Sequence, residues 1–346
     1  MCTENMVEQI DVLPLNDLKT LKKSLEGKIE ECDRTIILPH NNADYDAIGS
    51  AIGLSMIPKK LKKPSYVLCN DSTYKMEFGL QKILEEAKDN VEFINKDKYF
   101  SMEGVRDLFI LTDVSNLKLI SIPEIVNKSS DIIVIDHHDK TPYLVTGNYN
   151  YVDTKASSAS EIVTRLLKTF KIKIPSNIAN YLLAGIYLDT EKFSKISGET
   201  SKVMTTLFDS GASMDVVKKW FVESFESYKK VQCVVSNVNL LNYKLAIALG
   251  EEDVFYQREE LAKAADAILK FDVDASFAIG RIDNDTISIS ARGNNLVDVG
   301  SIMRELDGGG NHHAAATKID GSNLIETKDR LVKVLKPKYY RETEEK

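Results

Sequence analysis

Short β-rich apolar runs alternate with helix-like segments through the first two thirds of this sequence, and this alternation constrains the fold more than any other feature. The β-rich runs occupy residues 35–39, 65–69, 107–112 and 131–135. Apolar residues recur at helical spacing between or after them, over 47–56, 75–87, 159–170, 177–188, 202–210 and 215–238. Strands that alternate with helices build a parallel sheet with helices on both faces. We therefore expect an α/β fold for this region.

A second pattern of elements begins near Tyr243. A strand and a helix over 259–269 precede two alternating runs that a polar turn at 283–285 joins as a hairpin. Helices over 298–305 and 324–335 follow. We place the domain boundary within 230–243. The chain is then predicted to hold three parts and a frayed charged tail: a leader over 1–33 with a helix over 17–33, a larger α/β domain over 34–235, and a smaller α/β domain over 236–340.

Length and composition fit a folded protein of two or three domains. The 346 residues are 43% apolar and 28% charged, as in ordinary globular proteins. The apolar runs are far shorter than the roughly 18 residues of a membrane span, and we find no signal peptide. The four cysteines form no CxxC pair, which argues against disulfides and favours the cytoplasm. A net charge of −7 disfavours processive binding to long nucleic acid but permits a small anionic ligand.

All five histidines lie in short polar motifs, and acidic residues accompany them. His40 opens the motif HNNADYDAIGS, which supplies Asp44 and Asp46 between a strand and a helix. Three further motifs end predicted elements: LTD with Asp113, DHHD with Asp136, His137, His138 and Asp139, and LDT with Asp189. Any one of these aspartates alone would be interpreted as a helix cap or a turn former. In parallel sheets, however, ligands bind at the carboxyl ends of the strands, where these motifs gather.

Four acidic clusters and three histidines near one edge of a sheet predict a metal site. Crowded carboxylates raise one another's pKa unless cations neutralise them. Carboxylate ligands with some imidazole suit Mn²⁺ or a similar divalent ion. Two ions roughly 3.5–4 Å apart can hold a hydroxide and a phosphoryl oxygen, as in many phosphoesterases. We therefore expect a dinuclear centre.

The remaining motif is the glycine-rich stretch over 307–316, with sequence DGGGNHHAAA. Its glycines Gly308, Gly309 and Gly310 allow a ligand to approach the backbone, and their N–H groups could form an anion-binding nest. The alanines that follow indicate tight packing against neighbouring backbone. Arg292 ends a predicted strand shortly before this stretch and could bind phosphate, although it could also be an ordinary surface arginine.

With these motifs in hand, the sequence resembles the DHH–DHHA1 phosphoesterase family over about residues 35–335. The ordered set HxxxDxD, TD, DHH, DT and GGG followed by AA carries the resemblance. The segments ASSASEIVTRLL, LLAGIYLDTEKF, DASFAIGRI and ISISARG are most similar to the catalytic modules of bacterial cyclic-di-AMP phosphodiesterases. Such modules usually follow membrane helices and sensory modules, which we do not find, so we expect a free-standing version.

The resemblance implies two Mn²⁺ ions and a role for each motif residue. His40 and Asp44 resemble ligands of one metal, and Asp113 resembles the bridging carboxylate. The ligands of the second metal would be Asp46, His137 and Asp189. The resemblance also implies that His138 orients the phosphate or the leaving group, while Asp136 supports the loop that carries the ligands. In the second domain it implies that Arg292 and the glycine loop hold the nucleotide.

Two positions depart from the family pattern. The family usually has GGGH, whereas Asn311 stands at that histidine position here, with His312 and His313 following. Either His312 takes over the role or phosphate binding is weaker. Related phosphodiesterases also often carry an arginine where this chain has Ile196, for which Lys192 or Lys195 could compensate. Both departures concern the substrate and leave the predicted metal ligands intact.

Three functions therefore remain open. The first is an Mn²⁺-dependent phosphodiesterase that hydrolyses cyclic di-AMP to pApA, and potentially onward to AMP. The second is a nano-RNase or pAp phosphatase that acts on short linear oligonucleotides. The third is a nucleotide sensor without catalysis, which the altered GGGN loop favours and the complete set of metal ligands disfavours. The partner in each case is a small nucleotide, and the family resemblance also allows a homodimer.

Overall fold

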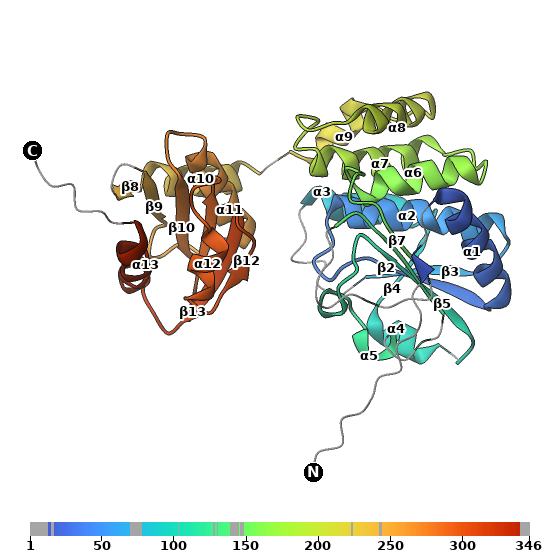
Figure 1. Cartoon of the computed structure of the whole chain (residues 1–346), viewed down its shortest axis with the longest axis horizontal. Coiled ribbons are helices and arrows are strands. Elements are labelled where there is room, and N and C mark those ends of the chain that lie inside the picture. The colour runs from blue at the N-terminus through green and yellow to red at the C-terminus, as the bar shows by residue number, and fades with distance from the viewer. Residues whose placement is uncertain are drawn as a thin grey trace, which may run out of the picture. The chain divides into compact units, whose positions relative to one another are not determined.

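The structure is a computed structural model of the whole chain. It describes residues 13–14, 17–69, 78–102, 104–126, 129, 131–138, 145, 149–222, 224–241 and 244–339. The expected tail, the start of the helix predicted at 75–87, and Asp139 lie outside the described residues. The chain divides into two compact units, Met1–Val222 and Glu223–Lys346 (Figure 1).

The first unit is built on a seven-stranded sheet whose strand pairs are all parallel. Its order is β1-β7-β6-β5-β2-β3-β4. The strands are β1 (Leu13–Pro14), β2 (Arg34–Leu38), β3 (Ser65–Leu68), β4 (Glu92–Ile94), β5 (Asp107–Thr112), β6 (Ile132–Asp136) and β7 (Tyr149–Val152). The parallel α/β sheet predicted from the sequence is confirmed.

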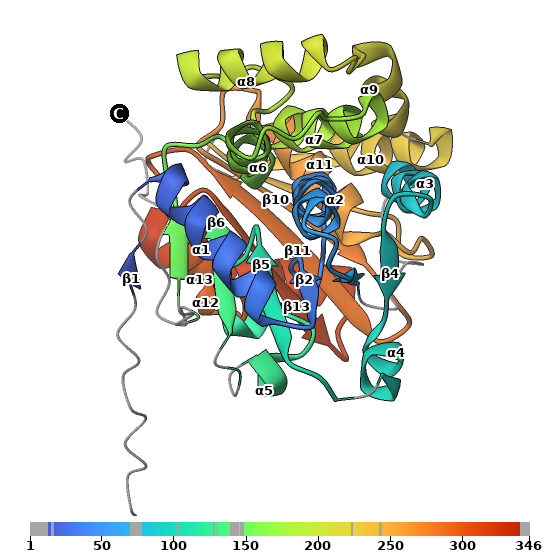
Figure 2. The ribbon, with the colours of Figure 1, turned by 90° about the vertical axis from the view of Figure 1, so that its right-hand side faces the viewer.

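Helices cover both faces of this sheet (Figures 1 and 2). One core holds side chains of α1 (Leu18–Glu31), α2 (Tyr45–Lys60), α3 (Phe78–Ala87), α6 (Ala159–Thr169), α7 (Ser176–Asp189), α8 (Gly198–Asp209) and α9 (Met214–Trp220). On the opposite face lie α4 (Lys96–Ser101), η2 (Leu117–Leu119) and α5 (Pro123–Val126). Successive strand residues enter opposite cores because side chains alternate along a strand: Ile37 packs in the first and Ile36 in the second.

The helix of the predicted leader belongs to the first unit. Asp17 caps its N-terminus by accepting hydrogen bonds from the N–H groups of Lys19 and Thr20 at 2.8 and 2.9 Å. Leu21, Leu25 and Ile29 recur four residues apart, and all are buried in the first core. The helix Leu18–Glu31 therefore belongs to the larger domain rather than to a separate part.

The second unit is a smaller α/β domain, as predicted, and it is built on a mixed sheet. Its order is β12-β13-β11-β10-β9-β8, with β9 and β10 parallel and the other pairs antiparallel. The strands are β8 (Val238–Leu241), β9 (Leu245–Leu249), β10 (Ala275–Arg281), β11 (Thr286–Gly293), β12 (Gly309–Gly310) and β13 (Ala314–Asp320). One face packs against α10 (Phe225–Ser236) and α11 (Arg258–Leu269), and the other against α12 (Val299–Arg304) and α13 (Leu324–Tyr339).

The compact units divide after Val222, earlier than the boundary expected within 230–243. The single helix expected over 215–238 is in fact two helices, α9 and α10. Trp220 at the end of α9 is 4% exposed and lies in the first core, whereas Val231 and Val234 of α10 pack with the second sheet. A continuous apolar periodicity hid this break because both helices bury one face, each in a different core.

Candidate metal centre

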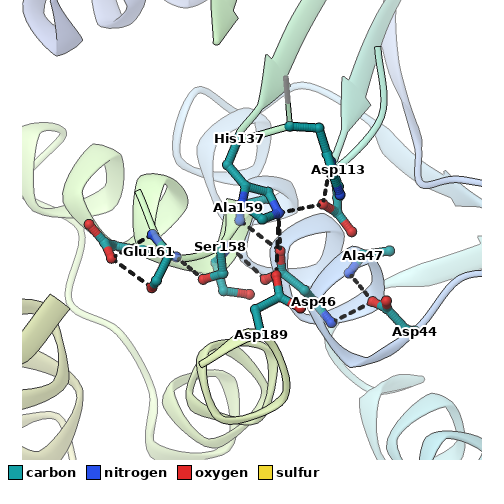
Figure 3. A network of polar contacts seen from close by, with 12 residues as sticks. Asp44, Asp46, Ala47, Asp113, His137, Ser158, Ala159, Glu161 and Asp189 are labelled. Carbon is teal, nitrogen blue, oxygen red and sulfur yellow. Dashed lines mark hydrogen bonds and ion pairs between the residues drawn. The ribbon is translucent and has the colours of Figure 1, made fainter. Parts of the chain in front are cut away.

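The predicted ligands come together at the carboxyl edge of the parallel sheet (Figure 3). His40 follows β2, and Asp113 directly follows β5. His137 follows β6, while Asp189 is the last residue of α7. Near the start of α2 lie Asp44 and Asp46. The strand ends therefore bring together residues that are up to about 150 positions apart in the sequence.

Donor atoms of these residues form two groups that share the Asp113 carboxylate. In one group, His40 Nε2 lies 3.8 Å from Asp44 Oδ2 and 3.5 Å from Asp113 Oδ2. In the other, His137 Nε2 faces three carboxylates, with distances of 3.3 Å to Asp113 Oδ1, 3.3 Å to Asp189 Oδ2 and 3.9 Å to Asp46 Oδ2. Figure 3 shows the carboxylates of Asp46, Asp113 and Asp189 gathered around the His137 ring. The grouping matches the two ligand sets that the family resemblance implies.

Asp44 both caps a helix and faces the cluster. Its Oδ1 accepts hydrogen bonds from the N–H groups of Asp46 and Ala47 at 2.9 and 3.1 Å, which is an N-cap of α2. Its Oδ2 stays on the side of His40. The Oδ1 atom thus serves as the helix cap that the sequence allowed, and the Oδ2 atom faces the cluster, where it could bind a metal.

Asp46 is held rigidly by a second helix. Its side chain is fully buried, and its two oxygens accept hydrogen bonds from Ala159 N (2.7 Å) and Ser160 N (2.8 Å) at the start of α6. A helix N-terminus offers free N–H groups and a partial positive charge, so it stabilises a carboxylate there. The arrangement fixes the direction in which Asp46 presents its oxygens to His137.

Two buried atoms of the cluster that could bind a metal have no hydrogen-bond partner: Asp113 Oδ1 and His137 Nε2. Buried polar atoms without partners cost roughly 1–3 kcal/mol each, so they are uncommon outside functional sites. Asp113 also has a φ of +58°, a strained left-handed conformation for a residue with a side chain. A divalent cation would supply the missing partner for both atoms, so these residues fit a metal.

The electrostatics of the cluster favour the same conclusion. Burial raises the pKa of Asp46 well above its usual value, and the nearby carboxylates of Asp113 and Asp189 raise it further. Burial by itself lowers the pKa of His137, but Asp113 and Asp189 outweigh it and raise that pKa to about 11. Without a cation, the Asp46 carboxyl and the His137 imidazole therefore hold their protons more tightly than usual. A divalent ion would replace those protons.

His138 lies beside the cluster and is 56% exposed at its side chain. Its Nδ1 is 2.8 Å from Asp136 Oδ1, and the same oxygen accepts the N–H of His137 at 2.8 Å. Asp136 therefore holds the His138 ring and the backbone of the segment that carries both histidines. Donor atoms of Asp113, His137 and His138 also form a third close group, so His138 is within reach of a bound ion.

A glycine on α7 makes room for the buried aspartate. Gly185 lies one turn before Asp189, on the same face of the helix. A Cβ atom at this position would lie 2.4 Å from Ser160 Oγ and 2.6 Å from Asp46 Oδ1. Only glycine therefore lets α7 approach α2 closely enough to bring Asp189 and Asp46 to the same imidazole.

In the second unit, Arg292 is bound by its own neighbours. Its Nε donates to Asp266 Oδ1 at 2.7 Å, and its Nη1 donates to the carbonyl of Ala291 at 3.1 Å. Asp266 is half-exposed, so solvent screens this pair and little free energy is needed to break it. Arg292 can therefore exchange Asp266 for a phosphate.

The glycine loop is a strand rather than the expected anion-binding nest. Gly309 and Gly310 form β12, which pairs with β13, and the N–H groups of Gly308 and Asn311 donate to the carbonyls of Met303 and Ala314. Gly310 has a φ of +139°, and a Cβ atom there would lie 2.4 Å from the carbonyl of Ala314. The close packing that the alanines indicated is thus confirmed, and it uses backbone groups that a nest would need.

Side chains of the same loop also bond locally. Asn311 Oδ1 accepts the N–H groups of His313 (2.9 Å) and Ala314 (2.8 Å), which closes the turn. His312 is exposed, with its Nδ1 3.9 Å from Asp298 Oδ1. Asn311 therefore serves as a turn former through its oxygen, a role that a histidine could not fill in the same way.

One buried acid near the cluster was not predicted. Glu161 is fully buried in the first turn of α6 and accepts hydrogen bonds from Ser157 and Thr200. The sequence does contain a signal, because Ser158 and Glu161 have the spacing of a capping box. That spacing predicts a helix start, but it does not reveal the distant partner Thr200.

Two family descriptions match this chain: "DHH family, N-terminal domain" over residues 34–186 and "DHHA1 domain" over residues 237–337. The chain therefore belongs to the DHH–DHHA1 phosphoesterase family, and the resemblance noted from its motifs is confirmed. The DHH family is metal-dependent, and the first unit contains the groups that could hold a metal.

Two curated relatives are similar to this chain in sequence, and one solved structure is similar to it in fold. It is 32% identical over 329 residues to the cyclic-di-AMP phosphodiesterase GdpP of Bacillus subtilis, covering 90% of this chain and 49% of GdpP. It is 34% identical over 176 residues to the probable bifunctional oligoribonuclease and PAP phosphatase NrnA of Streptococcus mutans, covering 50% and 51%. The fold matches an exopolyphosphatase-related protein from Bacteroides fragilis with a TM-score of 0.75 at 21% identity, covering 92% and 97%.

The chain thus spans about half the length of the curated relatives it matches. Among the helices in the described part of the chain, none combines the length and the apolar character that crossing a bilayer requires.

Proposed function

We propose that this chain is an Mn²⁺-dependent phosphodiesterase that hydrolyses cyclic di-AMP to pApA. The observation that carries the proposal is the pair of donor groups that share Asp113 and contain unpartnered buried atoms. The 32% sequence identity to GdpP, which extends over 90% of this chain, favours cyclic di-AMP as the substrate. The mixed carboxylate and imidazole donors favour Mn²⁺ or a similar ion.

The proposed ligands are His40 and Asp44 for one ion, and Asp46, His137 and Asp189 for the other, with Asp113 shared. When bound, two such ions lower the pKa of water and stabilise the charge that develops on a phosphate. Hydrolysis then adds water to phosphorus and breaks the bond to one 3′-oxygen, which takes up a proton. The product retains a 5′-phosphate and gains a 3′-hydroxyl, which is pApA.

We assign His138 as the residue that donates this proton to the 3′-oxygen. Its Nδ1 is held by Asp136, which leaves Nε2 as the atom that can release a proton to the 3′-oxygen. The Asp136 carboxylate also raises the pKa of His138, so the imidazole is protonated at higher pH than a free histidine. Its exposure would give a substrate access to this atom.

In the second unit, we assign nucleotide binding to Arg292, Asn311 and His312, while Gly308 and Gly310 let the loop pack closely against β13, with which Gly309 pairs. The weakly held Arg292 guanidinium supports a contact with phosphate. The polar side chains of Asn311 and His312 are already exposed, so a nucleotide can reach them without any change in the core. The homodimer that the family resemblance allows stays a prediction, which sedimentation velocity of the full chain would check.

The match to NrnA favours a second candidate, hydrolysis of short linear oligonucleotides or pAp. The same donor groups would serve this reaction, because it also transfers a phosphoryl group to water. The two functions differ in the size and the ends of the substrate, which the second unit would have to distinguish.

Turnover of purified protein with Mn²⁺ tests these alternatives. Cyclic di-AMP, cyclic di-GMP, pApA and pAp would be compared, with products resolved by chromatography over time. Rapid cleavage of cyclic di-AMP with accumulation of pApA is the expected result. Cleavage of the linear substrates alone would replace the proposal by the second candidate. Tight nucleotide binding with no cleavage of any substrate would contradict both and favour a sensor.

A further inference from the structure

A fully buried carboxylate, Glu161, joins two helix starts next to the candidate metal centre. Its Oε2 accepts three hydrogen bonds: from Ser157 N (3.1 Å), Ser157 Oγ (2.8 Å) and Thr200 Oγ1 (2.8 Å). Its Oε1 lies 3.5 Å from Nη1 of Arg165, which Asp153 also holds. Figure 3 shows Glu161 on the far side of Ser158 and Ala159 from Asp46.

The first connection runs through α6 to Asp46. Ser157 and the N-cap Ser158 directly precede the two N–H groups, of Ala159 and Ser160, that hold the Asp46 carboxylate. Glu161 therefore fixes the short segment from which those N–H groups project. A shift of this segment would turn the Asp46 oxygens relative to His137.

The second connection runs through α8 to Asp189. Thr200 lies in the first turn of α8, and only ten residues separate it from Asp189. Three consecutive residues of this segment, Glu191, Lys192 and Phe193, have φ values from +49° to +68°. Backbone in this conformation costs roughly 1–2 kcal/mol per residue, so the segment must be held at both ends. The bond from Thr200 to Glu161 anchors its far end.

We propose that Glu161 is a positioning residue for the metal that Asp46, His137 and Asp189 would bind. The inference rests on the proposed metal-dependent function. Asp46 and Asp189 come from different helices, and among the described residues the Glu161 carboxylate bonds to both segments that hold them. An ordinary helix cap would stabilise α6 and leave metal affinity unchanged. The linkage from α6 to α8 predicts that the affinity depends on the Glu161 oxygen.

Mn²⁺ binding to the full chain, followed through the electron paramagnetic resonance signal of the free ion, tests this. Glu161→Met keeps the length of the side chain but removes its acceptors, and we expect one of two bound ions to be held about 10-fold more weakly. Glu161→Gln keeps one oxygen acceptor and should recover most of that loss. Glu199→Gln is the matched control, since Glu199 is an exposed acid at the start of α8 that pairs with Lys202.

Thr200→Val removes only the hydroxyl at the α8 end and should weaken the same ion severalfold. Combined with Glu161→Met, it should add nothing, because both changes break one connection. Thr205→Val, which removes a hydroxyl elsewhere on α8, is its control. Wild-type affinity in Thr200→Val, or in a folded Glu161→Met, would overturn the inference even if thermal stability falls. Failure of the wild-type chain to bind Mn²⁺ would instead overturn the proposed function.

Discussion

The candidate metal centre of the first unit and the glycine loop of the second differ in whether their polar groups find hydrogen-bond partners within the protein. In the first unit, Asp113 Oδ1 and His137 Nε2 are buried without hydrogen-bond partners. In the second, Asn311 closes its own turn and Arg292 pairs with a half-exposed aspartate, Asp266. A buried set of like charges needs a ligand of opposite charge, whereas an exposed and internally bonded loop must exchange bonds to bind one. The comparison predicts strong metal dependence in one region and modest, separable effects in the other.

The largest effect is expected at the shared carboxylate. Asp113→Asn should lower the turnover of cyclic di-AMP by more than about 100-fold, beyond the roughly 10–100-fold that outer-shell partners contribute. It should also remove Mn²⁺ binding, because both donor groups lose a charge. Steady-state kinetics and metal titration would measure this. Asp283→Asn makes the same chemical change in the β10–β11 turn and serves as the control. Near-normal turnover in Asp113→Asn with metal supplied would contradict the mechanism.

Removal of the metal should destabilise the first unit selectively. Trp220, the only tryptophan in the sequence, is buried in the first core, so its fluorescence reports unfolding of that unit. Mn²⁺ at about 100 times its Kd stabilises by about 2.7 kcal/mol per site, which corresponds to roughly 5–10 °C in melting temperature for a unit of this size.

The comparison sharpens when the same melts are recorded with a chelator and with Asp113→Asn. In neither sample should Mn²⁺ raise the melting temperature of the first unit. A rise of equal size in Asp113→Asn would mean that the ion binds elsewhere in the chain.

At Arg292 we expect a smaller effect that is confined to the substrate. Charged hydrogen bonds contribute about 1.5–3 kcal/mol, so Arg292→Ala should raise KM by roughly 10–150-fold while Mn²⁺ affinity stays unchanged. Asp266→Ala frees the guanidinium and should not raise KM. Unchanged KM in Arg292→Ala would remove this arginine from the set of binding residues.

The smallest effect is expected at the loop tip. Asn311→Ala loses the bonds to the N–H groups of His313 and Ala314 and should lower the free energy of unfolding by about 1 kcal/mol. Asn311→Asp keeps the acceptor oxygen but adds a negative charge, so it should preserve stability and weaken nucleotide binding. Denaturant unfolding and binding titrations separate the two. Equal stability of the wild type and Asn311→Ala would show that the turn does not depend on this side chain.

The sequence predicted the first unit well because its signals are local. β-rich runs such as the one ending at Leu38 mark parallel strands, and polar residues directly after them mark the functional edge. The strands β4 and β7 escaped prediction because both are short and neither contains three apolar residues in a row. The break between α9 and α10 escaped because apolar spacing does not say which core receives a side chain.

The residues that could bind a metal were predictable from motifs. The hydrogen bonds that hold their helices in place were not. Glu161 and Thr200 are 39 positions apart, and their bond depends on how α6 and α8 pack. The glycine loop was misread for a related reason. Its composition allows both a nest and a closely paired strand, and only the neighbouring β13 decides between them.

Gly185 shows that a residue with no side chain can restrict substitutions as strongly as a residue that could bind a metal. It carries no side chain, donates nothing to a ligand and lies inside a helix where alanine would ordinarily be preferred. Yet any Cβ atom there would collide with the carboxylate of Asp46. In a library of all single substitutions, we expect this position to tolerate as few replacements as the donors themselves. The empty volume beside a glycine can thus be as specific a part of a metal centre as the atoms that surround it.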